Sequence, residues 1–257
     1  MTETQSIFAV IPARKGSKRI HNKNIKLLGN HPLIAYTIEA AKRSGIFKGI
    51  YVSTDSNAIG YIADYYGATC FKRPAQYARD NSPDIQWLKN LNKQRCGPEQ
   101  KLLRSIFGEY DYFAILRPTN PFRTPEMIYH AWQNYERGTW LKAIEPCGQH
   151  PHKMFVATEN NHIQPFDEDS SKPNLHALPT QSLNPVFVQN GSLEIRPIND
   201  LEPEILTGYV TQGYDGFDIN TEKDWVYAEW LIDTGKVKLI DIDKESICSK
   251  LPSILFS

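Results

Sequence analysis

A dense group of cationic side chains lies in the segment between Ile11 and Gly29. The six cations of this basic loop are Arg14, Lys15, Lys18, Arg19, Lys23 and Lys26. No Asp or Glu occurs between Glu3 and Glu39, although the whole chain balances 29 basic residues against 29 acidic ones. The positive charge is therefore local. A local cluster suits a small anion, whereas a nucleic-acid-binding protein usually carries a broad basic excess.

The basic loop contains the residue types that a triphosphate site needs. Gly16 and Ser17 allow a tight turn whose exposed N–H groups suit phosphate oxygens. Arg14 can bind a phosphate through two hydrogen bonds, while Lys18 and Lys23 can act as point charges. G-x-G-x-x-G does not follow the first predicted strand and G-x-x-x-x-G-K-[ST] is absent, so the loop is neither a dinucleotide fingerprint nor a P-loop. The alternative is a solvated basic loop without a ligand.

The elements that position this loop follow from the apolar pattern. Ser6–Pro12 is a short apolar run typical of a buried parallel strand, and the basic loop follows it directly. Helical patterns begin at Pro32 and Ala58, and further strands are expected at Gly49–Ser53 and Ala68–Phe71. This alternation predicts an α/β fold with a parallel sheet covered by helices. Ligands of such sheets collect at the carboxyl ends of the strands, where the basic loop begins.

The remaining elements are less regular. Later strands are expected at Asp111–Leu116, Leu141–Ile144, Gly191–Ile195, Ile205–Val210 and Gly216–Ile219, and later helices after Ser82, Thr124 and Thr221. Residues 147–190 are rich in His, Pro, Asn, Gln and Ser. We interpret them as an arm inserted into a single domain that spans residues 1–257.

Composition limits the class of protein. The four cysteines are far apart in sequence and form no C-x-x-C pair, which favours a reducing cytoplasm over a disulfide framework. No apolar run approaches the ~20 residues of a membrane span, and residues 1–6 lack the apolar core of a signal peptide. We expect a cytoplasmic protein that binds neither membranes nor nucleic acid.

The stretch Ile11–Asn24 reads I-P-A-R-x-G-S-K-x-x-x-x-K-N and resembles the nucleotide-binding signature of the acylneuraminate cytidylyltransferases, also called CMP-sialic acid synthetases. The resemblance continues through most of the chain, in the order and spacing of that family. It includes Pro32–Ala41, Val52–Asp55, Arg73–Ala75, Arg117–Thr124 and Asn190–Gly191. The first motif is specific, and the shorter ones support it together.

The resemblance implies a Rossmann-like nucleotidyltransferase core with a mainly parallel sheet and an inserted dimerisation arm. It implies Mg²⁺, a homodimer, and a reaction in which a 2-keto nonulosonic acid attacks the α-phosphorus of CTP and releases pyrophosphate. Arg14, Lys18 and Lys23 would hold the triphosphate, and Ser17 would complete the cradle. Asn24 and Arg73 would place the nucleotide.

A metal site is expected near the end of the chain. Asp218-Ile219-Asn220 stands where the family has D-x-D. Side chains one residue apart in an extended segment project to the same side, which suits a Mg²⁺ ion. Asp218 is the expected ligand, with an acid at a helix N-terminus as the alternative. Asn220 brings an oxygen without a charge, so it either ligates the metal or plays a supporting role.

The residues expected at the sugar acid depart from the family. Arg117 replaces a Gln and would contact the sugar acid or the nucleotide, with a structural ion pair as the alternative. Lys153 matches a lysine that reaches the sugar acid. Asp84 would approach the ribose or stabilise its own helix. Thr180 and Glu194 replace an arginine and an aromatic residue of the sialic acid pattern.

These departures leave the nucleotide chemistry intact and the sugar open. The segment Ala78–Asp84, A-R-D-N-S-P-D, resembles the legionaminic acid branch of the family. Two other hypotheses keep the fold. One is a nucleotidyltransferase for another nucleotide and a sugar phosphate, which would want a second basic cluster. The other is a catalytically silent homologue with a binding role, against which the intact Arg14, Lys23 and Asp218 argue.

Overall fold

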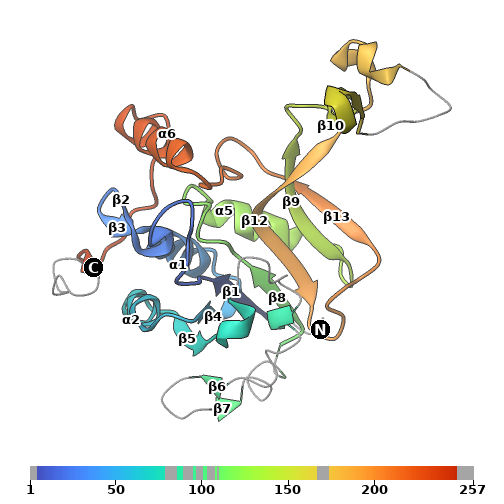
Figure 1. The fold of residues 1–257 in the computed structure, drawn as a ribbon. Helices are drawn as coiled ribbons and strands as arrows, with labels where there is room; N and C mark the ends of the chain where they lie inside the picture. Colours follow the sequence, from blue (N-terminus) through green and yellow to red (C-terminus); the bar gives the residue numbers. More distant parts are fainter. Residues whose placement is uncertain are drawn as a thin grey trace.

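The computed structural model describes residues 5–78, 86–88, 95–96, 101–102, 108, 110–166 and 174–247. Within these residues one large mixed sheet has the strand order β13-β9-β12-β8-β1-β4-β5-β6-β7 (Figure 1). Its strands are β1 (Ile7–Pro12), β4 (Phe47–Thr54), β5 (Thr69–Lys72), β6 (Arg95–Cys96), β7 (Lys101–Leu102), β8 (Tyr112–Ile115), β9 (Trp140–Pro146), β12 (Phe187–Pro197) and β13 (Leu206–Val210). The four-stranded centre β8-β1-β4-β5 is parallel, and β12 runs antiparallel to both of its neighbours.

The central strand β1 is buried on both faces, as its continuous apolar sequence predicts. Ile7, Ala9 and Ile11 face the larger core, which holds the apolar stripes of the helices. Phe8 and Val10 face a smaller core on the opposite side of the sheet. The long helices are α1 (Leu33–Arg43), α2 (Asn57–Tyr66), α5 (Pro125–Gln133) and α6 (Glu222–Asp233). The predicted alternation of strands and helices is therefore confirmed.

Helix ends follow local sequence signals. Ser56 and Thr124 accept hydrogen bonds from the backbone N–H groups of Ile59 and Met127 at the starts of α2 and α5. The helix expected after Thr221 begins with a full capping box that Thr221 forms with Asp224. The short elements near the basic loop are η1 (Lys23–Ile25), β2 (Leu27–Leu28), β3 (His31–Pro32) and η2 (Ala75–Tyr77).

The loop before α6 differs from the sequence expectation. The predicted strand Gly216–Ile219 is wrong, because this segment pairs with no strand. It is instead a loop tied to the loop after β8, where Ile219 N–H donates to the carbonyl of Thr119 at 2.8 Å. Asn120 Nδ2 also donates to the carbonyl of Phe217 at 3.1 Å. The helix expected after Ser82 begins outside the described residues, although 86–88 are helical.

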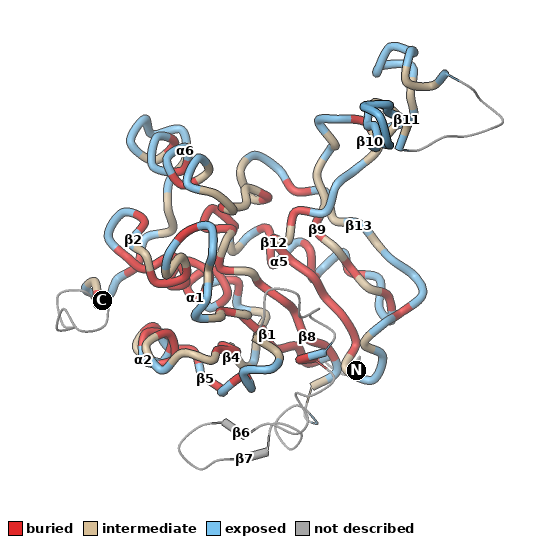
Figure 2. Tube along the Cα trace, viewed as in Figure 1, coloured by how far each residue is buried: buried red, intermediate tan, exposed pale blue. Residues whose placement is uncertain are grey.

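The described residues between β9 and β12, 147–166 and 174–186, project away from the sheet (Figure 1). They contain η4 (Pro151–Lys153), β10 (Phe155–Ala157), η5 (Glu159–Asn161), β11 (Ile163–Pro165), η6 (Leu175–Ala177) and η7 (Thr180–Ser182), with β10 and β11 paired antiparallel. Much of this projection is exposed (Figure 2), including the apolar side chains of Met154, Phe155, Val156, Ile163, Phe166 and Leu178. Among the helices described, none combines the length and the apolar character needed to cross a membrane.

Candidate functional site

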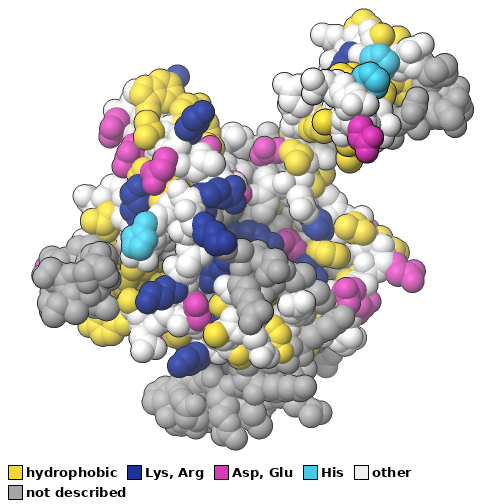
Figure 3. Space-filling view, in the orientation of Figure 1, with side chains coloured by type: hydrophobic (Ala, Val, Ile, Leu, Met, Phe, Trp, Pro, Cys, Tyr) yellow, Lys and Arg dark blue, Asp and Glu magenta, His cyan; other side chains and the backbone are white. Residues whose placement is uncertain are grey.

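A cavity of about 270 Å³ opens where the carboxyl ends of β1, β5 and β8 meet the loop before α6. Its lining includes five cations, Arg14, Arg19, Lys23, Arg73 and Arg117, and one carboxylate, Asp218. Figure 3 shows Lys and Arg side chains gathered in the hollow between α6 and the projecting arm. Charges from segments up to 200 residues apart in sequence therefore converge on one site that suits a polyanion.

The cavity brings together eight of the residues that the sequence singles out: Arg14, Ser17, Lys23, Asn24, Arg73, Arg117, Asp218 and Asn220. Lys18 does not line it, and Asp84 lies outside the described residues. Arg19 and Tyr77 also line the cavity, and sequence reasoning gave neither a role. Arg19 belongs to the basic loop, so its charge was a usable signal, whereas nothing in the sequence marks Tyr77.

Asn24 stabilises the conformation of the basic loop. Its side chain is buried, and its Nδ2 donates to the carbonyl of Arg14 at 3.1 Å. The chain enters η1 at Asn22, whose φ of 49° is in the left-handed region that Asn tolerates better than most residues. The hydrogen bond from Asn24 to the Arg14 carbonyl joins the two ends of the basic loop and so fixes its path between β1 and η1.

Lys23 is a half-buried cation of the basic loop. Its Nζ donates to the carbonyl of Ile219 at 2.6 Å, which joins the basic loop to the loop before α6. Burial lowers the pKa of Lys23, and the neighbouring Arg19 and Arg14 lower it further, against the opposing effect of Asp218 and Asp224. A lysine whose charge is disfavoured in this way gains strongly from an incoming anion.

Asp218 and Asn220 line the cavity next to each other and are joined by a hydrogen bond. Asn220 Nδ2 donates to Asp218 Oδ2 at 2.7 Å, and Asn220 Oδ1 lies 3.5 Å from Arg19 Nη2. Asp218 Oδ1 is buried and has no hydrogen-bond partner among the described residues. In that part of the chain no group of three or more His, Cys, Asp and Glu residues could hold a metal by itself. One unsatisfied carboxylate oxygen beside a polyanion site does fit Mg²⁺, which commonly binds one or two carboxylates together with substrate phosphates.

The arginines of the site are held by different means. Arg73 is buried, donates from Nε to Ser53 Oγ at 2.9 Å, and places its guanidinium 4.7 Å from the centre of the Trp87 ring. Arg117 forms an ion pair with Glu194, in which Nη2 and Oε1 are 2.8 Å apart. The structural ion pair that was the alternative for Arg117 therefore exists, and Arg117 still borders the cavity.

Arg123 is a buried support that sequence reasoning missed. Its Nη2 donates to the carbonyl of Arg117 at 2.8 Å, and its Nε donates to the carbonyl of Ser192 at 2.6 Å. Burial lowers the pKa of Arg123 to about 9. The side chain thus ties the loop after β8 to β12, directly beneath the cavity.

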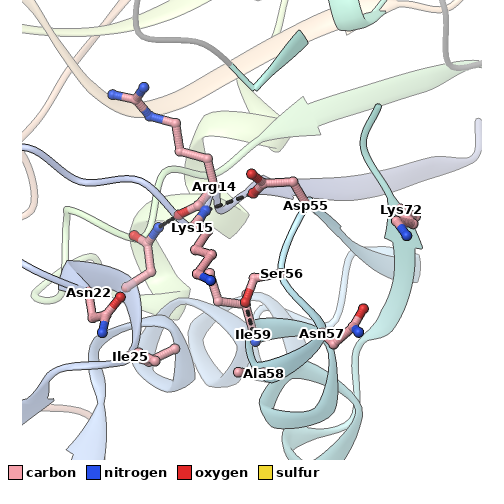
Figure 4. A pocket seen from close by; sticks show the side chains of 11 residues that line it. Arg14, Lys15, Asn22, Ile25, Asp55, Ser56, Asn57, Ala58, Ile59 and Lys72 are labelled. Carbon is pink, nitrogen blue, oxygen red and sulfur yellow. Dashed lines mark hydrogen bonds between the residues drawn. The ribbon is translucent and has the colours of Figure 1, made fainter. Parts of the chain in front are cut away.

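A second cavity, of about 360 Å³, lies between the basic loop and the start of α2 (Figure 4). Asp55 Oδ1 accepts a hydrogen bond from the backbone N–H of Lys15 at 2.7 Å. The guanidinium of Arg14 points away from the α2 residues that line this cavity. Asp55 therefore anchors the basic loop from the end of β4.

Lys153 lies apart from this site, in the projecting arm. Its Nζ donates to the carbonyls of His176, at 2.7 Å, and Leu178. It does not line the cavity that holds Arg117 and Asp218. Within one chain Lys153 therefore stabilises the arm.

Comparisons with known proteins place these features in a family context. A family model described as Cytidylyltransferase matches residues 8–95. The chain is 31% identical over 249 residues to the CMP-N,N'-diacetyllegionaminic acid synthase of Legionella pneumophila, a match that covers 91% of this chain and 99% of that protein. It is 33% identical over 167 residues to a pseudaminic acid cytidylyltransferase of Campylobacter jejuni, covering 64% of this chain and 69% of that one.

A third relative is longer than this chain. The N-acylneuraminate cytidylyltransferase of Escherichia coli is 34% identical over 188 residues, which are 72% of this chain and 42% of that protein. Among solved structures, CMP:2-keto-3-deoxy-manno-octonic acid synthetase in complex with CTP matches with a TM-score of 0.62 at 12% identity, covering 90% of this chain and 100% of that one. A 4-diphosphocytidyl-2C-methyl-D-erythritol synthase from Anaerococcus prevotii matches with a TM-score of 0.57. These structures share the fold, a Rossmann-like nucleotidyltransferase core.

Proposed function

Because the chain belongs to the cytidylyltransferase family, we propose that it uses CTP to activate a nonulosonic, sialic-acid-like 2-keto sugar acid. The product is the CMP-sugar, and pyrophosphate is released. The observation that carries this proposal is the convergence of five cations and Asp218 on one cavity at the carboxyl ends of the strands. A triphosphate supplies the negative charge that this arrangement lacks.

The reaction forms a bond between the anomeric oxygen of the sugar acid and the α-phosphorus of CTP. It breaks the bond between the α-phosphorus and the oxygen that bridges to the β-phosphate, so pyrophosphate leaves. Catalysis of this kind depends on positioning and on neutralising charge. Arg14 and Lys23 line the cavity and hold the triphosphate and the leaving pyrophosphate, with Ser17 in the cradle. Lys18, an exposed residue of the same loop that does not line the cavity, stays a candidate for the same role. Asn24 keeps the loop in shape, and Arg73 places the nucleotide.

Asp218 would hold Mg²⁺ through its unsatisfied oxygen, and Asn220 would orient Asp218 or add its own oxygen. When bound, the ion would neutralise phosphate charge that the lysines and arginines do not reach. Arg117 then lies on the sugar side of the cavity, where a cation suits the carboxylate of the acceptor. Asp84, which lies outside the described residues, stays our candidate for the ribose.

We also propose a homodimer in the reducing cytoplasm. The dimer is supported by the arm, residues 147–190, whose apolar side chains are exposed to an unusual degree for a single chain. Lys153 would then serve the sugar acid of the partner's site. The reducing compartment is supported by the sequence, whose four cysteines are far apart and form no C-x-x-C pair.

Pyrophosphate release is the direct test. The protein is incubated with Mg²⁺, one of CTP, UTP, ATP or GTP, and a panel of sugar acids that includes N,N'-diacetyllegionaminic, pseudaminic and N-acetylneuraminic acid. We expect turnover with CTP and a preference for the legionaminic acid. N-acetylneuraminic acid should be poor, because each buried polar atom left unpaired by the wrong sugar costs ~1–3 kcal/mol. The proposal would be overturned if pyrophosphate were released with UTP, ATP or GTP but not with CTP, or if it were released without a sugar acid.

A further inference from the structure

Glu194 lies at the centre of a compact group of charged residues beside the cavity. This Glu194 cluster consists of Arg117, Trp140, Lys142, Glu194 and Arg196. Glu194 is buried, with 8% of the residue exposed. Its Oε1 accepts from Arg117 Nη2 at 2.8 Å, and its Oε2 accepts from Arg196 Nη2 at 2.8 Å and from Trp140 Nε1 at 3.1 Å. A buried carboxylate with three donors is held in one orientation.

Strand register explains why these residues meet. Trp140 and Lys142 are two residues apart in β9, as Glu194 and Arg196 are in β12, so each pair projects to one face of the sheet. Glu194 stands opposite Lys142 in the β9–β12 pairing and opposite Ile115 in the β8–β12 pairing. Arg117 follows Ile115 by two residues, so the end of β8 delivers it to Glu194.

The cluster carries an excess of positive charge, three cations against one carboxylate. The Arg196 guanidinium lies 3.6 Å from the centre of the Trp140 ring, and Lys142 Nζ lies 4.1 Å from it. Burial lowers the pKa of Lys142, and Arg196 and Arg117 add to this effect although Glu194 opposes it. An anion bound next to the cluster would therefore be favoured.

A glycine on β12 leaves the space that Arg117 occupies. Gly191 has a φ of +70°, and a Cβ at this position would come within 3.2 Å of Arg117 Cδ and 3.3 Å of its Nε. The β9–β12 register shifts between Gln189 and Glu194, so this segment bulges beneath the arginine. Arg117 is thus directed from two sides, by the Glu194 carboxylate and by the open space over Gly191.

We propose that Glu194 is a positioning residue that fixes Arg117 at the edge of the cavity to receive the carboxylate of the acceptor sugar acid, and that Lys142 supplies a second positive charge to the same group. This inference rests on the proposed function, since it names the ligand of the sugar side of that site. It makes Glu194 a determinant of affinity for the sugar acid without direct contact with CTP.

The first test is Glu194→Gln in the full-length protein. We expect KM for the best sugar acid of the panel to rise about tenfold, as loss of a charge-assisted hydrogen bond does, while KM for CTP stays within about twofold. In an Arg117→Ala background the same change should have almost no further effect on KM for the sugar acid, because Glu194 acts through Arg117. Thermal unfolding of each variant separates this effect from a loss of folded protein.

Lys142 has a matched control elsewhere in the chain. Lys236 Nζ also lies over a tryptophan ring, 5.2 Å from the centre of Trp230 on α6, and it is not part of the Glu194 cluster. Lys142→Met should raise KM for the sugar acid severalfold, whereas Lys236→Met should leave it unchanged.

The outcomes separate the two proposals. If the wild-type protein releases no pyrophosphate from CTP with any sugar acid, the proposed function fails. If the wild type is active but Glu194→Gln raises both KM values together, or acts additively with Arg117→Ala, Glu194 is only structural and the inference is wrong.

Discussion

At the residue scale we expect the basic loop to depend most on Lys23, because Lys23 joins this loop to the loop before α6 and burial disfavours its charge. We expect Lys23→Ala to lower kcat by roughly two orders of magnitude, as removal of a group that stabilises charge in the transition state does. Lys26→Ala is the matched control in the same loop. Lys26 lies 3.3 Å from Glu222 on the exposed surface, and its loss should leave kcat unchanged. Equal loss of activity in both variants would contradict the role of Lys23.

Asp218 and Asn220 allow a second prediction at this scale. Asp218→Ala should abolish Mg²⁺-dependent turnover. Asn220→Asp should be tolerated or should lower the Mg²⁺ concentration needed for half-maximal activity, because it adds a hard anionic oxygen. In EDTA the same variant should unfold at a lower temperature than wild type, since a carboxylate would replace the amide that donates to Asp218. If the Asn220→Asp protein is inactive but as stable as wild type in EDTA, the amide NH₂ of Asn220 is required for activity and Asn220 does not ligate the metal.

At the element scale the cap of α6 is joined to the segment that carries Asp218 and Asn220. Asp224 Oδ2 accepts from the backbone N–H groups of Asn220, at 2.9 Å, and Thr221, at 2.7 Å. Burial acts to raise the pKa of Asp224, but these hydrogen bonds and Lys23 hold it below its ordinary value of 3.8. The stabilisation is therefore present above the ordinary pKa and is lost as the pH falls through the folded-state pKa.

The prediction at this scale concerns Asp224→Ala. The variant should lose ~1 kcal/mol of unfolding free energy at neutral pH, as removal of a helix cap does. The difference from wild type should shrink as the pH falls below about 4, because the protonated wild-type side chain no longer contributes. Urea unfolding at a series of pH values measures this. A difference that stays constant into acid would show that the cap does not depend on the carboxylate charge.

At the scale of the whole molecule the parallel sheet gathers the site along one edge, so ligand binding should stabilise the entire fold. CTP at about 100 times its Kd should add ~2.7 kcal/mol to the free energy of unfolding by mass action. ATP and GTP at the same concentration should raise Tm far less. Thermal scans with each nucleotide test this, and equal shifts for all of them would indicate a general polyanion site.

Much of the fold is determined by sequence patterns that act locally. The apolar run of β1, the stripes of α1 and α2, and the helices after Thr124 and Thr221 appear in the structure as expected. The basic loop could be predicted from the sequence as well, because its six cations lie close together along the chain. Gly216–Ile219 was misread because short apolar segments look like strands, whereas a strand also needs a neighbour with which to pair.

Only the tertiary structure decided how charges distant in sequence combine. It paired Arg117 with Glu194 across 77 residues, placed Arg19 beside Asn220, and left Asp218 Oδ1 without a partner among the described residues. It also placed Lys153 against arm carbonyls, away from the cavity. The physical reason is that periodicity and capping depend on neighbours along the chain, while a side chain's charge partner depends on strand order and register. The residue types at 117 and 194 were readable from the sequence, but their ion pair required the sheet that brings β8 beside β12.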